Sequence, residues 1–197
     1  MNAPAPRGWL ALTAVLALAA LGGWWLPRSA LDWQPALAAR EPWRALTAVA
    51  VHYSALHLGA NLAGAALVGA LGVAARVPRA FVLAWLAAWP LTQFGLLLRP
   101  DLPHYGGLSG VLHAGVTVAA LWLLARERGR RQLVGAALLA ALLLKILGES
   151  PWGPAVQARA GWDIAIAPFA HASGAVCGLL CARLALLFAS PAHHAKP

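Results

Sequence analysis

Charged residues are scarce in this chain of 197 residues: 11% are Asp, Glu, Lys or Arg, whereas 61% are hydrophobic. Soluble domains carry about 25% charged and about 45–50% apolar residues. The low charge and the long apolar runs exclude an ordinary soluble domain and indicate an integral membrane protein, whose solvent is lipid. At this length we expect one domain, residues 1–197, of the all-α membrane class.

Acidic residues and cysteines are especially few, with six Asp and Glu against fifteen Lys and Arg. The net charge of +9 does not indicate nucleic-acid binding, because the basic residues lie at the ends of apolar runs, facing lipid headgroups. Cys177 and Cys181 are four residues apart on one helical face and cannot easily form a disulfide with each other. We therefore expect both to be small packing residues. A His-Glu-x-x-His motif is absent, and the apolar segments offer no carboxylate ligand. We therefore expect neither a metal nor another cofactor.

Six apolar segments are candidates for membrane-spanning helices, each of which needs about 20 residues. They are 8–26, 46–73, 80–98, 108–125, 133–147 and 168–189. The second is long, and its start near Trp43 and Arg44 is predicted to be interfacial. The first resembles a signal peptide, but no clear small-x-small cleavage site follows it. The expected fold is a compact bundle of six transmembrane helices.

Six spans place both termini on the same side of the membrane. The distribution of basic residues indicates which side this is, because Lys and Arg are enriched in cytoplasmic segments. With the termini inside, nine of the fifteen basic residues lie in inner segments: Arg7, Arg76, Arg79, Arg126, Arg128, Arg130, Arg131, Arg183 and Lys196. We therefore expect cytoplasmic termini. Spans two, four and six then begin on the outer side, and the unusual polar residues of all three fall in the outer half of the bilayer.

Ser109 lies at the start of the fourth span, between Gly107 and Gly110. Glycine permits a tight turn and the close approach of another chain. Unpaired N–H groups and the positive end of the helix dipole favour a developing oxyanion at a helix start. The alternative is a serine that merely caps the helix, and this motif alone does not separate the two.

His171 lies near the start of the sixth span and is followed by Gly174 and Gly178. Two small residues four apart let one membrane helix approach another closely. We expect these glycines to press span six against span four and to bring the His171 imidazole near Ser109. Ionisable groups inside membranes are costly and indicate function, although a buried histidine bonded to a carbonyl is the alternative.

Three further histidines and an asparagine accompany this pair. His113 is one turn below Ser109 on the same face, where it can support His171, line a water pocket or simply pack. His57 and Asn61 share a face of span two and can aim two donors at one oxyanion. His52 points away from Asn61 and is expected to tie the outer loop to the top of the helix.

Spans two, four and six contain no Asp or Glu, so a Ser-His-Asp triad is not expected. A Ser-His dyad with a compensating oxyanion site is the consistent arrangement. Asp163 and Glu149 lie in the segment before span six. Either can polarise the site, but neither has a helical spacing that favours it.

Four motifs, in order and on the correct spans, resemble the rhomboid intramembrane serine proteases over nearly the whole chain. They are Glu41-Pro-Trp-Arg44, which is similar to the tryptophan-arginine motif of the first outer loop; His52, His57 and Asn61 of the second helix; Gly107-Leu-Ser-Gly110; and Ala170-His-x2-Gly-x3-Gly178. The resemblance implies that Ser109 is the nucleophile and His171 the general base. It also implies that His57, Asn61 and the Ser109 N–H form the oxyanion site.

His113 departs from this pattern, because many rhomboids have a tyrosine there that packs on the catalytic histidine. With the compact six-span form, this residue makes the chain similar to the rhombosortase subfamily, and Lys145-Ile-Leu-Gly-Glu149 is similar to the end of its fifth helix. The resemblance implies bacterial inner-membrane location and an active site toward the outer face. It also implies substrates with a C-terminal Gly-Gly motif, an apolar span and a basic tail.

Three alternatives stay open at this point. The chain can be a general rhomboid protease of type I membrane proteins, or a non-catalytic rhomboid-like protein that binds client helices in the membrane. A small transporter that relays protons through its histidines is the third, but it leaves the Gly107-Leu-Ser-Gly110 motif unexplained.

Overall fold

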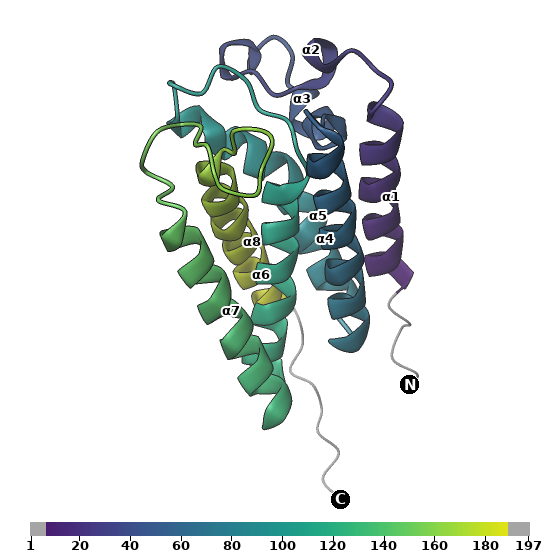
Figure 1. The fold of residues 1–197 in the computed structure, drawn as a ribbon. Coiled ribbons are helices and arrows are strands. Elements are labelled where there is room, and N and C mark those ends of the chain that lie inside the picture. Colours follow the sequence, from purple (N-terminus) through teal and green to yellow (C-terminus); the bar gives the residue numbers. More distant parts are fainter. Residues whose placement is uncertain (1–6, 189–197) are drawn as a thin grey trace, which may run out of the picture.

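Apolar helices form the body of the molecule in the computed structural model, which describes residues 7–188 (Figure 1). The long helices are α1 Arg7–Gly23, α4 Ala55–Ala74, α5 Arg79–Phe94, α6 Ser109–Arg126, α7 Arg130–Gly148 and α8 Pro168–Phe188. The short ones are α2 Arg28–Leu31 and α3 Arg44–Thr47, with 3-10 turns η1 Pro35–Leu37, η2 Ala48–Ala50 and η3 Gly95–Leu98. The outer ends of the predicted domain, 1–6 and 189–197, including Ala189 and Lys196, lie outside the described residues.

Within residues 7–188, five segments are long and apolar enough to cross a membrane: α4, α5 with η3, α6, α7 and α8. The sixth apolar helix, α1, has 17 residues, which span about 25 Å at 1.5 Å per residue and reach the lower limit for a transmembrane helix. The predicted all-α bundle of six apolar helices is confirmed. The fifth span, the shortest in the sequence-based prediction, is a full 19 residues here.

Helix α6 occupies the centre of the bundle and packs against α4, α5, α7 and α8. In α6, 61% of the membrane-spanning segment is buried inside the protein, whereas in α7 only 11% is buried. Most of the α7 surface therefore faces outward, and Figure 1 shows α7 at one edge of the bundle with α1 at the other. Ser109 is the first residue of this central helix. Its position is therefore at one end of the helix that contacts four others.

Helices α6 and α8 approach each other closely at their glycines. A Cβ atom added to Gly174 would lie 1.9 Å from the Gly110 carbonyl oxygen, and one added to Gly178 would lie 2.6 Å from the Ala114 carbonyl oxygen. These distances leave no room for a side chain. The close approach predicted from the small-residue spacing of span six is present.

Helix α4 begins later than the prediction of 46–73 for span two, because the apolar run is interrupted. The turns α3 and η2 are followed by extended residues, and the helix begins at Ala55. Ser54 caps it: its side-chain oxygen accepts a hydrogen bond from the His57 N–H at 3.0 Å, which satisfies one of the free donors of the first turn. His52 consequently precedes the helix instead of lying on it.

The segment between α1 and α4 covers one end of the bundle and is tied down by Arg44. The guanidinium of this buried residue donates to the carbonyl oxygens of Ser29 and Asp32 at 2.8 and 2.9 Å and pairs with the side chains of Asp32 and Glu41. Reciprocal backbone hydrogen bonds of 2.7 Å link Trp33 to Tyr105. The segment before α4 and the segment before α6 are thereby joined next to the start of α6.

Candidate active site

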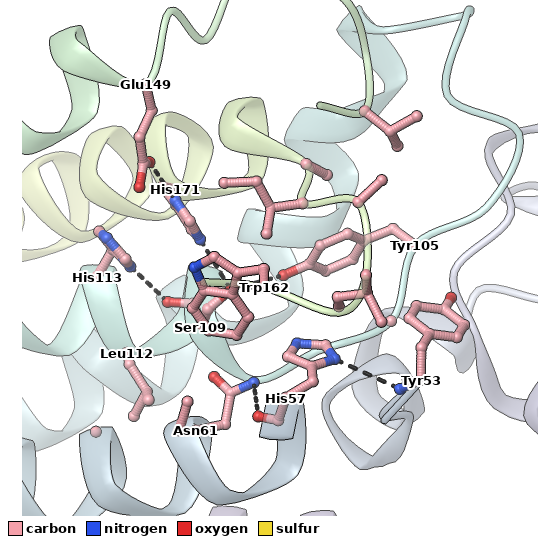
Figure 2. A pocket seen from close by; sticks show the side chains of 18 of the residues that line it. Tyr53, His57, Asn61, Tyr105, Ser109, Leu112, His113, Glu149, Trp162 and His171 are labelled. Atoms are coloured by element: carbon pink, nitrogen blue, oxygen red, sulfur yellow. Dashed lines mark hydrogen bonds and ion pairs between the residues drawn. The ribbon is translucent and has the colours of Figure 1, made fainter. Parts of the chain in front are cut away.

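Ser109 and His171 face each other across the α6–α8 contact (Figure 2). The Ser109 Oγ atom lies 3.0 Å from His171 Nε2, a normal hydrogen-bond distance. As the first residue of α6, Ser109 has a backbone N–H without an intrahelical acceptor. The pair therefore combines a hydroxyl next to a base with an N–H group and the positive end of a helix dipole.

Gly107 shapes the backbone just before this serine. Its φ of +142° is one that L-residues with a side chain rarely adopt. Its N–H donates to the Ala48 carbonyl oxygen at 2.9 Å, and a Cβ atom at this position would lie 3.0 Å from His57 Nε2. The absence of a side chain thus lets the turn pass close to the His57 ring.

His57 and Asn61 lie on one face of α4 that points toward Ser109. The Tyr53 N–H donates a long hydrogen bond of 3.4 Å to His57 Nδ1; with Nδ1 as acceptor, the neutral ring carries its proton on Nε2, the nitrogen that faces Gly107. Asn61 Nδ2 donates one hydrogen to the His57 carbonyl oxygen at 3.1 Å. Its second hydrogen stays available for another acceptor.

His113 lies against the ring of His171. Its Nδ1–H donates to the Ser109 carbonyl oxygen at 2.7 Å, which fixes the ring. The ring is then parallel to that of His171, with an interplanar angle of 9° and centroids 4.2 Å apart. His113 therefore stacks on His171 and also lines the cavity described below.

Glu149, at the end of α7, contacts the far side of the His171 ring. Its Oε2 atom accepts a hydrogen bond of 2.6 Å from His171 Nδ1, and its Oε1 atom accepts one of 2.6 Å from Lys145 Nζ. Of the two acidic residues left open above, Glu149 is therefore the one that contacts His171. Asp163 instead accepts a hydrogen bond of 2.7 Å from the Ser54 hydroxyl, at the start of α4.

The remaining residues of the predicted site lie around this centre without contacting Ser109. His52 is buried, and its ring centroid is 4.8 Å from that of His57. Burial is the main cause that lowers the pKa of His52, and the His57 ring adds to it, giving a value of about 4; the ring is neutral at pH 7. Arg44 anchors the segment between α1 and α4, and Trp43 is exposed.

A cavity of about 840 Å³ lies beside Ser109, between α4, α6 and α7. Its polar end is formed by the residues described above. Its apolar part is lined by Leu67, Val68, Leu112, Val116 and Leu142. The cavity therefore has a polar end next to Ser109 and an apolar lining further along.

The segment 149–167 covers the polar end of the cavity. Trp162 lies edge-on to His57, with ring centroids 6.3 Å apart, and the Asp163–Ser54 hydrogen bond ties the segment to the start of α4. Below it, the Tyr105 hydroxyl lies 3.5 Å from Ser109 Oγ. Among residues 7–188, no three His, Cys, Asp or Glu side chains are grouped so that they can hold a metal ion.

Sequence reasoning missed Tyr105 and Trp162 and left Glu149 undecided. Tyr105 directly precedes the two glycines before Ser109, so its place in the motif is the signal that could have found it. For Glu149 the signal is the i, i+4 spacing from Lys145 at a predicted helix end. Trp162 has no such signal, because it lies in an irregular segment.

In a comparison with protein families, the model of the Rhomboid domain matches residues 39–188. The match spans most of the chain and includes every residue of the site described above. No curated protein matches the chain.

Proposed function

Because the chain belongs to the rhomboid family, whose members are intramembrane serine proteases, we propose that it cleaves transmembrane proteins with Ser109 as nucleophile and His171 as general base. The observation that carries the proposal is the 3.0 Å distance between Ser109 Oγ and His171 Nε2, within an apolar helical bundle. A serine hydroxyl beside an acceptor nitrogen is the arrangement that nucleophilic acyl transfer requires.

The reaction proceeds in two acyl-transfer steps. Ser109 Oγ attacks the scissile carbonyl carbon while its proton passes to His171 Nε2, and collapse of the tetrahedral intermediate breaks the C–N bond as His171 returns the proton to the leaving amine. Water then hydrolyses the Ser109 ester by the same proton transfers. His57 Nε2–H, Asn61 Nδ2–H and the Ser109 N–H stabilise the oxyanion in each step.

The apolar part of the cavity supports entry of a substrate helix from the lipid. It is lined by α4, α6 and α7, and α7 is the least buried of the candidate spans. A transmembrane segment can therefore lie against apolar side chains while its unwound end reaches Ser109. Cleavage then occurs near one membrane face, not at the bilayer centre.

We place this face on the outside of a bacterial inner membrane, with both termini in the cytoplasm. The start of α1 and the end of α8 lie at the end of the bundle opposite to the site (Figure 1). The basic cluster of residues 126–131 lies at the turn between α6 and α7, also away from the site. Basic residues are enriched in cytoplasmic segments.

For the substrate we propose proteins with a C-terminal Gly-Gly motif before an apolar span and a basic tail. The support is the similarity to rhombosortases carried by His113 and by the Lys145–Glu149 segment. Glycine also lowers helix stability by about 1 kcal/mol per residue relative to alanine, so two glycines help the substrate to unwind at Ser109. A general rhomboid protease would instead accept ordinary type I spans.

The test is cleavage of a co-expressed membrane substrate by wild-type enzyme and by Ser109→Ala, with covalent labelling by a fluorophosphonate. We expect both activities in the wild type and neither in Ser109→Ala or His171→Ala. Labelling without cleavage, or cleavage that persists in Ser109→Ala, contradicts the proposal. Unlabelled wild-type protein favours a non-catalytic client-binding protein.

Substrate identity requires a separate measurement. C-terminal mass mapping of surface proteins from cells with active or Ser109→Ala enzyme should show trimming next to Gly-Gly motifs in the active strain alone. Processing restricted to ordinary type I spans would favour the general rhomboid protease.

A further inference from the structure

The imidazole of His171 is held on both sides. While Nε2 faces Ser109, Nδ1 donates to Glu149 at 2.6 Å, and the His113 ring lies against its face. The Glu149 side chain is 17% exposed, so the carboxylate is largely withdrawn from water. Its second oxygen accepts from Lys145 at 2.6 Å. Both carboxylate oxygens therefore have a hydrogen-bond donor.

The charge state of Glu149 determines which nitrogen of His171 carries the proton. Burial tends to raise the pKa of the Glu149 carboxyl, but its hydrogen bonds and charge interactions with His171 and Lys145 outweigh burial and lower the pKa to about 2. An ionised carboxylate is an acceptor only. Nδ1 must then hold a hydrogen, so the neutral ring presents the Nε2 lone pair to Ser109, as a general base requires.

Other titratable groups face this centre from the neighbouring elements. His113 belongs to α6, His57 to α4, and Lys145 to α7. Arg159 of the covering segment donates to the Glu149 carbonyl oxygen at 2.7 Å. Among the described residues, Glu149 is the acidic side chain that hydrogen-bonds His171. Its negative charge favours a positive charge on this ring, whereas Lys145 Nζ, 3.5 Å from His171 Nδ1, opposes one.

Lys145 explains how the carboxylate is held in place. It lies four residues before Glu149 in the last turn of α7, a spacing that brings the two side chains together. A cation is also favourable at a helix C-terminus. The Lys145 side chain is 47% exposed and retains contact with water, whereas the carboxylate points inward.

We propose that Glu149 is a positioning residue of the active site, which extends the Ser109–His171 pair to a Ser-His-Glu arrangement supported by Lys145. Glu149 fixes the tautomer and orientation of His171 and stabilises the imidazolium that forms when Nε2 takes the Ser109 proton. No proton passes to Glu149. The inference rests on the proposed protease function and revises the expectation of a two-residue dyad.

The first test compares steady-state cleavage of a fluorogenic transmembrane substrate by full-length wild type, Glu149→Gln and Glu149→Asp in detergent or proteoliposomes. We expect Glu149→Gln to lower kcat by about 10²–10⁴-fold with little change in KM. Glu149→Asp, which keeps the charge, should recover at least about tenfold of that loss. Glu127→Gln is the matched control, because Glu127 also pairs with a basic residue four positions away, Arg131, but at the opposite end of α7.

A kcat of Glu149→Gln equal to that of Glu127→Gln overturns the inference, and so does a rise in KM at constant kcat. An Asp variant no better than the Gln variant does the same. Cleavage that depends on Ser109 in these preparations shows that the protease function stands even if the inference fails.

The second test needs no variant of Glu149 and therefore does not depend on how such a variant folds. ¹⁵N NMR of histidine-labelled protein, with the His171 signals assigned by their loss in His171→Ala, reports the protonated nitrogen at neutral pH. A proton on Nδ1 supports the inference. A neutral ring protonated on Nε2 overturns it.

Discussion

Replacement of Gly174 by alanine should separate Ser109 from His171 without touching either residue. The added Cβ atom would lie 1.9 Å from the Gly110 carbonyl oxygen, whereas real Cβ atoms do not approach closer than 3.0 Å. The clash is with backbone, so no side chain can rotate away. Helices α6 and α8 must therefore move apart by about 1 Å at this point.

This shift is large compared with the range of distances over which Ser109 and His171 can form a hydrogen bond. The Ser109 Oγ to His171 Nε2 distance is 3.0 Å, and a further 1 Å takes it beyond hydrogen-bond range. Misplacement of a catalytic group by about 1 Å costs about 10²-fold in rate. Overpacking in a tight core also costs about 1–3 kcal/mol of stability.

The assay is the rate of fluorophosphonate labelling of Gly174→Ala, together with the thermal unfolding midpoint in detergent. We expect labelling about 10²-fold slower than in the wild type and a lower Tm. Gly59→Ala is the control, because a Cβ atom at Gly59 meets nothing within 4 Å; its labelling rate should equal that of the wild type. Unchanged labelling of Gly174→Ala would refute the reasoning that this contact sets the Ser109–His171 distance.

Three other perturbations test separate parts of the structure. His57→Ala should lower kcat by about 10²–10³-fold at similar KM; a kcat close to that of the wild type in steady-state kinetics would remove His57 from the oxyanion site. Arg44→Ala removes the guanidinium partner of the buried Asp32 carboxylate, which keeps a hydrogen bond of 2.9 Å from Gln34 Nε2, and should cost about 3–5 kcal/mol, seen as a lower denaturation midpoint. An unchanged midpoint would show that the segment between α1 and α4 does not depend on this pair. Because the pKa of Glu149 is lowered in the folded protein, its stabilisation is complete above about pH 4.5 and is lost as the pH falls toward about 2. The Tm of the wild type should therefore fall more steeply over this range than that of Glu149→Gln, and parallel curves would contradict the assignment.

The spans and the helix pairing could be predicted because they depend on local patterns. Apolar runs of about 20 residues specify a transmembrane helix with little influence from context. The spacing of Gly174 and Gly178 specifies a close helix contact. The start of α4 was less predictable, since hydropathy does not distinguish the turns over 44–50 from the helix that begins at Ala55.

The core of the candidate site was also predictable, from topology. Ser109, His171 and the pair His57 and Asn61 come from three helices that begin at the same end of the bundle, so their convergence needs no detail of packing. The Glu149 contact does need such detail. It depends on how the last turn of α7 lies against α8, which places Glu149 Oε2 2.6 Å from His171 Nδ1, and this packing has no signature in the hydropathy pattern.

The helices that carry the site differ in how much of their surface is buried: α6 and α8 are buried more than α7. Ser109 and His171 belong to α6 and α8, whose backbones contact each other directly at Gly110 and Gly174. Glu149 lies just after α7, which is the least buried candidate span. A displacement of α7 by an entering substrate helix would therefore lengthen the Glu149–His171 hydrogen bond before it disturbed the Ser109–His171 pair.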